Sequence, residues 1–346
     1  MKNIMSRLPG VLLDWYQENK RDLPWRQDKE PYHVWLSEIM LQQTRVEAVK
    51  GYYRHFLQVL PTVESLASCP EDALYKLWEG LGYYSRVRNL KKAAQTVVDK
   101  YDGRFPNTYK QVLELPGIGD YTAGAICSIC FDLPTPAVDG NVMRVMSRLL
   151  DDAAPIDTQT QKRKMKDLLA GCYPHQAGDF TQALMELGAT LCGPNREPQC
   201  HACPCKEFCL GAIRGTASAL PVKTPKKPRT LQDRTVFILR CGDSYAVCKR
   251  PDKGLLAGLW QFPDVEGRLD LEQSLDAVRT MGMEPTNVLR QSEKIHVFTH
   301  VQWTMRGWYM DVDRQAPNLM WVSGAELDTR FALPTAYRQF WEPDVK

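Results

Sequence analysis

Two carboxylates stand in sequence contexts that favour opposite protonation states. Glu38 lies in an apolar stretch, where burial would raise the pKa of its carboxyl group and keep it protonated near neutral pH. Asp139 lies at the start of a periodic run, where the positive end of a helix would keep its carboxylate charged. Cleavage of a glycosidic bond requires such a pair, because one group protonates the leaving group and the other stabilises a cationic sugar.

Each carboxylate also has an ordinary structural interpretation. Asp139 could simply cap its helix, since aspartate is a preferred N-cap residue. Glu38 lies in a helix predicted from Tyr32 to about Thr44, and it could reach solvent or pair with Arg45. These interpretations stay open at the level of the sequence.

The segment Leu115-Pro-Gly-Ile-Gly-Asp-Tyr-Thr-Ala123 predicts a helix, a tight turn and a second helix. Gly117 and Gly119 permit positive φ and close backbone approach. The free N–H groups of the second helix could bind a phosphate without a basic side chain, which fits a net charge of only +3. A plain corner between two helices is the alternative, and the carboxylate of Asp139 downstream argues against it.

Four of the eleven cysteines lie close together, separated by seven, two and five residues: Cys192, Cys200, Cys203 and Cys209. Four neighbouring thiolates predict a metal site with all-cysteine ligation, and the spacing alone favours zinc. Cys205 lies inside the same segment. The odd number of cysteines and the lack of a visible export signal predict a reducing compartment.

The chain of 346 residues is long enough for two domains. Residues 1–215 are rich in helical signals, residues 216–234 are rich in proline and basic residues and predict an extended linker, and residues 235–346 predict strands with one helix. A content of 44% hydrophobic and 25% charged residues is typical of a globular protein, and no apolar run reaches membrane-spanning length.

Together these motifs resemble the MutY-type adenine DNA glycosylases of the endonuclease III superfamily. The match includes residues 22–26, 35–44 and 78–84, the hairpin, residues 137–141, and residues 252–260 beyond the linker. The resemblance implies an all-α helix-hairpin-helix glycosylase domain with an iron–sulfur cluster loop, and a C-terminal α/β domain similar to Nudix folds. It also implies that the four cysteines hold a [4Fe–4S] cluster and not zinc.

The resemblance implies a role for each matching residue. Glu38 would protonate adenine, Asp139 would stabilise the sugar cation, and Tyr121 and Asn141 would assist around Asp139. The residues implied to line the adenine pocket or contact DNA are Arg26, Gln43, Thr44, Tyr83, Gly117, Gly119, Glu186, Phe298, Thr299 and His300. The implied partner is double-stranded DNA with adenine opposite 8-oxoguanine or guanine, and we expect a monomeric, cytoplasmic, bacterial protein that binds no membrane.

Tyr121 replaces a lysine of the strand-cleaving relatives. A lysine could attack the anomeric carbon and form a Schiff base, whereas a tyrosine cannot. We therefore expect hydrolysis by water without strand cleavage. Two further departures from the family pattern concern the first cysteine gap, which has seven residues instead of six, and Thr299, which stands where the family often has serine.

Three other functions remain to be weighed against this one. A bifunctional thymine-glycol-type lyase would require a lysine at Tyr121. A Nudix-like nucleotide hydrolase would require a cluster of glutamates for magnesium, and residues 254–283 do not supply one. A non-catalytic DNA-binding protein with a structural metal would leave Glu38 and Asp139 without a purpose.

Overall fold

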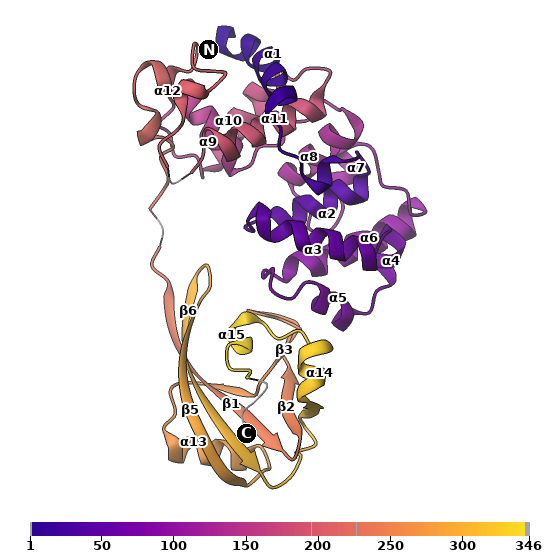
Figure 1. Cartoon of the computed structure of the whole chain (residues 1–346), viewed down its shortest axis with the longest axis vertical. Coiled ribbons are helices and arrows are strands. Elements are labelled where there is room, and N and C mark those ends of the chain that lie inside the picture. The colour runs from indigo at the N-terminus through magenta and orange to yellow at the C-terminus, as the bar shows by residue number, and fades with distance from the viewer. Residues whose placement is uncertain (1, 195, 226, 343–346) are drawn as a thin grey trace. The chain divides into compact units, whose positions relative to one another are not determined.

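The computed structural model describes residues 2–194, 196–225 and 227–342, which divide into two compact units (Figure 1). The first unit comprises Met1–Ser68 and Arg88–Pro225, and the second comprises Cys69–Val87 and Lys226–Lys346. The sequence predicts one domain over residues 1–215. Cys69–Val87 lies within that stretch and forms part of the second compact unit.

The first unit is built from helices, as the sequence predicts. Its elements are α1 (Lys2–Asn19), η1 (Pro24–Arg26), α2 (Pro31–Leu41), α3 (Val46–Val59), α4 (Val63–Ser68), most of α6 (Ser85–Tyr101), α7 (Tyr109–Leu113), α8 (Asp120–Phe131), α9 (Gly140–Leu150), α10 (Gln159–Ala170), α11 (Ala177–Thr190), η2 (Cys200–Ala202), α12 (Leu210–Ile213) and η3 (Ala217–Ala219). The helix predicted to run to about Thr44 ends at Leu41. Its continuation is prevented at Gln43, whose φ of 58° is left-handed.

Helix α11 lies at the centre of this unit and packs against α1, α8 and α9. Leu8 and Leu12 of α1 and Leu184 of α11 are almost completely buried in the shared core. Helix α8 lies close to the backbone that precedes α9. A Cβ on Gly124 of α8 would lie 2.4 Å from the carbonyl oxygen of Pro136. The absent side chain therefore lets α8 lie directly against the segment that leads to α9.

The two hairpin glycines serve different purposes. Gly117 has a φ of 77°, and a Cβ there would lie 2.5 Å from Cβ of Asn89, so both conformation and space require glycine. Gly119 has an ordinary φ of −101° and is the N-cap of α8. The freedom that glycine gives the backbone is therefore used for a positive φ at Gly117 and not at Gly119.

The second unit contains α5 (Glu71–Leu77) and a seven-stranded sheet of order β3-β2-β1-β6-β5, with β4 paired to β1 and β7 paired to β2. The strands are β1 (Thr230–Cys241), β2 (Ser244–Lys249), β3 (Trp260–Gln261), β4 (Asp264–Glu266), β5 (Pro285–Val297), β6 (Val301–Val312) and β7 (Met320–Ser323). Strands β1 and β6 are parallel, and the other pairs are antiparallel. The predicted hairpin of β1 and β2 is confirmed.

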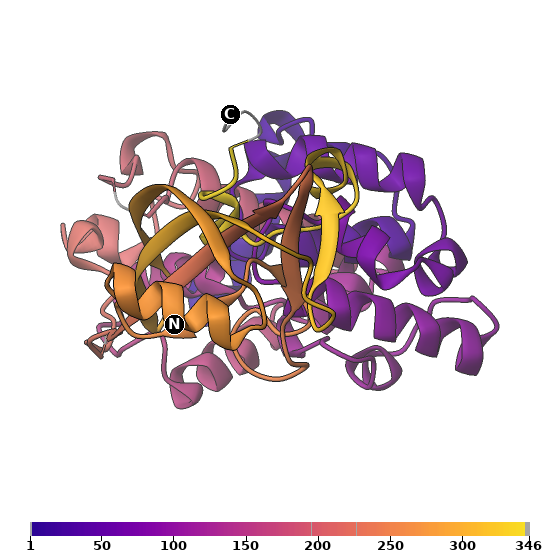
Figure 2. The same ribbon diagram turned by 90° about the horizontal axis from the view of Figure 1, so that it is seen from below.

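The sheet is covered on both faces, as Figures 1 and 2 show. Alternate residues of β1 point to opposite faces, so Phe237 packs with α13 (Leu271–Thr280) while Val236 packs with the segment of α14 (Gly324–Thr329) and α15 (Thr335–Arg338). Strand β1 begins at Thr230, so residues 230–234 of the predicted linker belong to the sheet. Among the described residues, no helix combines the length and apolar character needed to span a membrane.

Candidate active site

A cavity of about 510 Å³ in the first unit collects most of the predicted catalytic residues. It is lined by residues of η1, α2, α8, α9 and α11 together with the turn after α2. The predicted residues in its wall are Arg26, Glu38, Gln43, Thr44, Tyr121, Asp139, Asn141 and Glu186. Residues that are far apart in the sequence therefore surround one space.

Glu38 is buried on α2, with only 6% of its surface exposed. Burial raises the pKa of its carboxyl group to about 7, although the Tyr121 hydroxyl that donates to Oε2 over 2.6 Å acts in the opposite direction. The alternative contact with Arg45 is not the one formed. A carboxyl group with this pKa is suited to act as a general acid near neutral pH.

Tyr121, the second residue of α8, donates its hydroxyl to Oε2 of Glu38. Burial raises the pKa of Tyr121 well above its ordinary value, and the negative charges of Glu38 and Asp139 both act on this phenol and raise its pKa further. The phenol therefore remains a hydrogen-bond donor. Tyr121 therefore holds the carboxyl group of Glu38 in a defined orientation.

Asp139 is both the N-cap of α9 and a wall of the cavity. Its Oδ1 accepts from the Val142 amide over 2.7 Å, and its Oδ2 accepts from Nδ2 of Asn141 over 2.7 Å. Burial nevertheless raises the pKa of Asp139 above the ordinary value. Removal of water from the carboxylate outweighs the hydrogen bonds from Val142 and Asn141 and the nearby charge of Arg144, all of which lower this pKa. These donors still favour its charged form and give it more support than the single phenol gives Glu38.

Arg144 is a residue of the site that the sequence analysis missed. Its Nη2 donates to Oδ1 of Asn141 and to the carbonyl oxygen of Gly188, each over 2.8 Å, and its Nε donates to the carbonyl oxygen of Cys192 over 2.8 Å. The amide of Asn141 is thereby oriented toward Asp139. The spacing of three residues between Asn141 and Arg144 on one helix face was the available signal.

Glu186 is completely buried and is held by two arginines. Its Oε1 lies 2.5 Å from Nε of Arg21, and its Oε2 lies 2.8 Å from Nη2 of Arg26. Burial alone would raise the pKa of Glu186, but the contacts with Arg21 and Arg26 outweigh it and lower that pKa. Glu186 is therefore a charged anchor for Arg26, and Arg21 is a second residue that the sequence analysis missed.

Two residues that were expected to contact DNA have left-handed backbones although neither is glycine. Gln43 of the first unit has a φ of 58°, and Tyr83 of the second unit has a φ of 47° with 47% of its surface exposed. Such strain persists where the surrounding structure imposes it, and it is frequent at functional sites. Within the second unit, the Tyr83 hydroxyl lies 3.4 Å from Oγ1 of Thr299.

The neighbours of Thr299 form the end of the β5–β6 hairpin. The ring of Phe298 packs at 4.8 Å from that of Trp303, and the carbonyl oxygen of His300 accepts from the Thr230 amide over 3.0 Å. Phe298 is therefore anchored in the core of the second unit, while Thr299 and His300 are exposed. The structure thus separates one packing residue from two that can reach a ligand.

The cysteine segment is held against the end of α9 by Arg148. Nη1 of Arg148 donates to Sγ of Cys192 over 3.3 Å, and the carbonyl oxygen of Arg148 accepts from Sγ of Cys209 over 3.4 Å. A Cβ on Gly211 would lie 2.5 Å from the same carbonyl oxygen. Cys205 is 2% exposed and belongs to the same apolar core as the predicted ligand Cys209.

The four predicted ligand cysteines lie in the segment that follows α11, where Cys192, Cys200 and Cys203 are half-buried and Cys209 is buried. Over the described parts of the chain, no three His, Cys, Asp or Glu side chains are arranged to hold one metal ion. Four thiols are a donor set that suits a [4Fe–4S] cluster as well as a zinc ion.

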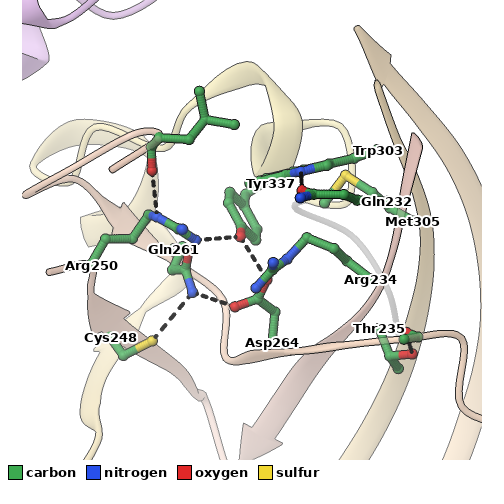
Figure 3. A network of polar contacts seen from close by, with 12 residues as sticks. Gln232, Arg234, Thr235, Cys248, Arg250, Gln261, Asp264, Trp303, Met305 and Tyr337 are labelled. Atoms are coloured by element: carbon green, nitrogen blue, oxygen red, sulfur yellow. Dashed lines mark hydrogen bonds and ion pairs between the residues drawn. The ribbon is translucent and has the colours of Figure 1, made fainter. Parts of the chain in front are cut away.

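The second unit carries a buried polar network (Figure 3). Asp264 of β4 forms an ion pair with Arg234, and its carboxylate accepts from Tyr337 over 2.9 Å and from Gln261 over 2.7 Å. Arg250 in turn donates to the Tyr337 hydroxyl over 3.0 Å. The carboxylate of Asp264 thus has ion-pair and hydrogen-bond partners inside the fold.

Comparisons with known sequences match both parts of the chain. A model of the HhH-GPD superfamily of base excision DNA repair proteins matches residues 36–171. A model of the NUDIX domain matches residues 235–343. The first match includes the hairpin and both carboxylates, and the second begins where the predicted linker ends.

Several characterised sequences are similar along most of the chain. An adenine DNA glycosylase of Rattus norvegicus is 36% identical over 91% of this chain and 72% of its own length. An adenine DNA glycosylase of Homo sapiens is 35% identical over 94% of this chain and 71% of its own length. One from Buchnera aphidicola is 32% identical over 86% of this chain and 84% of its own length.

Solved structures support the fold of the helical part. A thermostable thymine-DNA glycosylase matches 62% of this chain and 98% of its own chain, with a TM-score of 0.56 and 27% identity. Endonuclease III trapped as a covalent intermediate with DNA matches 62% of this chain and 98% of its own, with a TM-score of 0.53 and 21% identity. The latter similarity concerns the fold alone.

Proposed function

Because this chain belongs to the adenine DNA glycosylase family, and is therefore a base excision repair enzyme that hydrolyses N-glycosyl bonds, we propose that it removes adenine paired with 8-oxoguanine or guanine. The observation that carries the proposal is the convergence of Glu38 and Asp139 on one cavity, each held by its own polar partner. We further propose that the protein acts on duplex DNA as a monomer.

The reaction begins with the extrusion of adenine, since its glycosidic bond is inaccessible within the stacked duplex. Glu38 gives its proton to a nitrogen of the imidazole ring of adenine, and the glycosidic bond breaks with its electron pair on the departing base. Asp139 stabilises the positive charge that develops at the anomeric carbon. A water oxygen adds to that carbon and loses a proton, which leaves an abasic site.

DNA would be held by backbone groups and by two strained residues. The amides at the start of α8, after Gly117 and Gly119, supply donors for a phosphate. Gln43 and Thr44 at the rim of the cavity, and Tyr83 in the second unit, enter the duplex near the mispair. The left-handed backbones of Gln43 and Tyr83 support this assignment, since such strain is common where a residue is presented to a ligand.

The proposed function is tested by a single-turnover assay on an A:8-oxoguanine duplex, with and without alkali. We expect release of adenine and strand breaks only after alkali, because Tyr121 offers no amine to form a Schiff base. A control duplex in which the same adenine is paired with thymine should stay intact. Borohydride trapping of a stable protein–DNA adduct would contradict hydrolysis by water.

Thr299→Ala is expected to weaken the preference for 8-oxoguanine over guanine more than it slows excision at saturation. The hydroxyl of Thr299 is the group that can donate to or accept from the modified purine, and its loss leaves that purine with one partner fewer. The ratio of excision rates on A:8-oxoguanine and A:G duplexes at limiting enzyme measures this effect. An unchanged ratio would show that the Thr299 hydroxyl does not contribute to discrimination between 8-oxoguanine and guanine.

We propose that Cys192, Cys200, Cys203 and Cys209 hold a [4Fe–4S] cluster, with the first sulfur supported by the guanidinium of Arg148. A cluster held by these cysteines would cross-link the segment that follows α11, and no step of the excision is assigned to it. Purified protein is expected to contain about four iron atoms per chain and to show a brown absorbance. Full occupancy by zinc in the absence of iron would contradict this ligand assignment.

A further inference from the structure

Three charged residues of α5 and of the turn that follows it meet buried polar atoms of the sheet domain within the second unit. Asp72 and Lys76 lie four residues apart on one side of α5, and Glu79 lies in the turn after the helix. We call their contacts with Trp260, Phe331 and Leu333 the α5 contact.

The α5 contact supplies partners to groups that cannot reach water. Glu79 Oε1 accepts from the Leu333 amide over 3.0 Å, and Lys76 Nζ donates to the carbonyl oxygen of Phe331 over 3.3 Å. Phe331 and Leu333 are at most 3% exposed. Buried backbone groups require hydrogen-bond partners, so this surface is built to receive the polar side chains of α5.

Asp72 makes the third contact. Its Oδ1 accepts from Nε1 of Trp260 over 3.1 Å and lies 3.5 Å from Nζ of Lys249. Both charged side chains of the ion pair are more than 40% exposed, so solvent screens it and its contribution is small. The main contribution of Asp72 is therefore its hydrogen bond with Trp260, which is only 8% exposed.

A stiff loop connects this contact to Tyr83. Nε1 of Trp78 donates to the carbonyl oxygen of Gly82 over 3.1 Å, and Nη2 of Arg86 donates to that of Leu81 over 2.8 Å and to that of Gly82 over 3.1 Å. The guanidinium of Arg86 also lies 5.6 Å from the centre of the Tyr83 ring. The loop therefore has little freedom, and a shift of α5 is passed on to Tyr83.

We propose that the α5 contact positions Tyr83 against Thr299 and thereby sets the discrimination between 8-oxoguanine and guanine opposite adenine. Asp72 and Glu79 are positioning residues, since they act through Tyr83 and touch no substrate. The effect on base discrimination rests on the proposed function, because it requires the proposed substrate. The α5 contact itself does not, because it is present in the chain without DNA.

The test compares two double variants of the full chain with the same change in net charge. Asp72→Ala/Glu79→Ala removes both accepting oxygen atoms, whereas Asp72→Asn/Glu79→Gln removes both charges but keeps an oxygen that accepts from Trp260 and from Leu333. Two readouts are measured, namely amide hydrogen exchange of residues 69–87 and 331–333, and the ratio of excision rates on A:8-oxoguanine and A:G duplexes.

We expect the alanine variant to exchange faster in both segments and to lose at least about fivefold in the excision ratio, the factor expected for one net hydrogen bond. The asparagine and glutamine variant should stay close to wild type in both readouts. A change in stability alone would slow excision on both duplexes equally and leave the ratio unmoved.

Other results would overturn the inference in distinguishable ways. Unaltered exchange in the alanine variant would show that the α5 contact does not form. Faster exchange with an unaltered ratio would show that the contact does not influence the reading of the base. Failure of the wild-type chain to release adenine from either duplex would refute the proposed function, and the role in discrimination with it, while the exchange data would still report on the contact.

Discussion

Glu38→Gln is expected to lower base excision by more than about a hundredfold, the low end of the effect of general acid catalysis. Glutamine has the same shape and can still accept the hydrogen bond of the Tyr121 hydroxyl, but it has no proton to give to adenine. The loss therefore reports on proton donation and not on packing. Single-turnover excision on an A:8-oxoguanine duplex at saturating enzyme measures it.

The pH dependence provides an independent check on the role of Glu38. Its pKa is raised to about 7, so the protonated form that the reaction requires is lost as the pH rises through that value. The excision rate of the wild-type protein should fall on the alkaline side of about pH 7, and the residual rate of Glu38→Gln should lack this decline. A near-normal rate in the variant, or a decline of the same shape, would remove Glu38 as the proton donor.

Asp139→Asn is expected to lower excision by about a hundredfold to a thousandfold, the range found when one stabilising group is removed from a charged transition state. Asparagine caps helices as well as aspartate does, so α9 should keep its start at Gly140. The substitution removes the charge of Asp139 and the oxygen that accepts from Nδ2 of Asn141, while one oxygen remains to accept from the Val142 amide and cap α9.

The matched control for this variant is Asp270→Asn. Asp270 is the N-cap of α13 in the second unit and accepts from the Gln273 amide, so the same chemical change is made at another helix start. The control should leave excision unchanged, and both variants should melt close to the wild-type temperature. An Asp139→Asn protein that is folded and excises adenine at the wild-type rate would contradict the role of the carboxylate.

Asp139 also predicts the acid side of the pH profile. Because burial raises its pKa, protonation removes the required charge at a higher pH than for an ordinary aspartate. The decline of the excision rate on the acid side should be absent from the residual activity of Asp139→Asn. Together with Glu38, this gives a profile with two limbs, each assigned to one side chain by its own variant.

Local features of this protein could be predicted from the sequence because they depend on residues a few positions apart. The glycine in the left-handed turn at Gly117, the cap at Asp139 and the hairpin of β1 and β2 follow from backbone conformation and short-range hydrogen bonds. The family resemblance added predictions that local features do not give, namely the two domains and the residues of the cavity. The cysteine spacing added the prediction of a metal site. For these features, neighbouring residues carry most of the information.

Tertiary structure alone decided which groups touch and how strongly burial acts on them. The partner of Glu38 is a phenol 83 residues away, and Glu186 is held by arginines 160 and 165 residues away. The pKa of Asp139 is raised by burial against the hydrogen bonds at its helix end, because desolvation depends on every neighbouring element, whereas a cap involves only one. The sequence around Cys69–Val87 also contains no local pattern that predicts its place in the second compact unit, because that place depends on contacts with residues far along the chain.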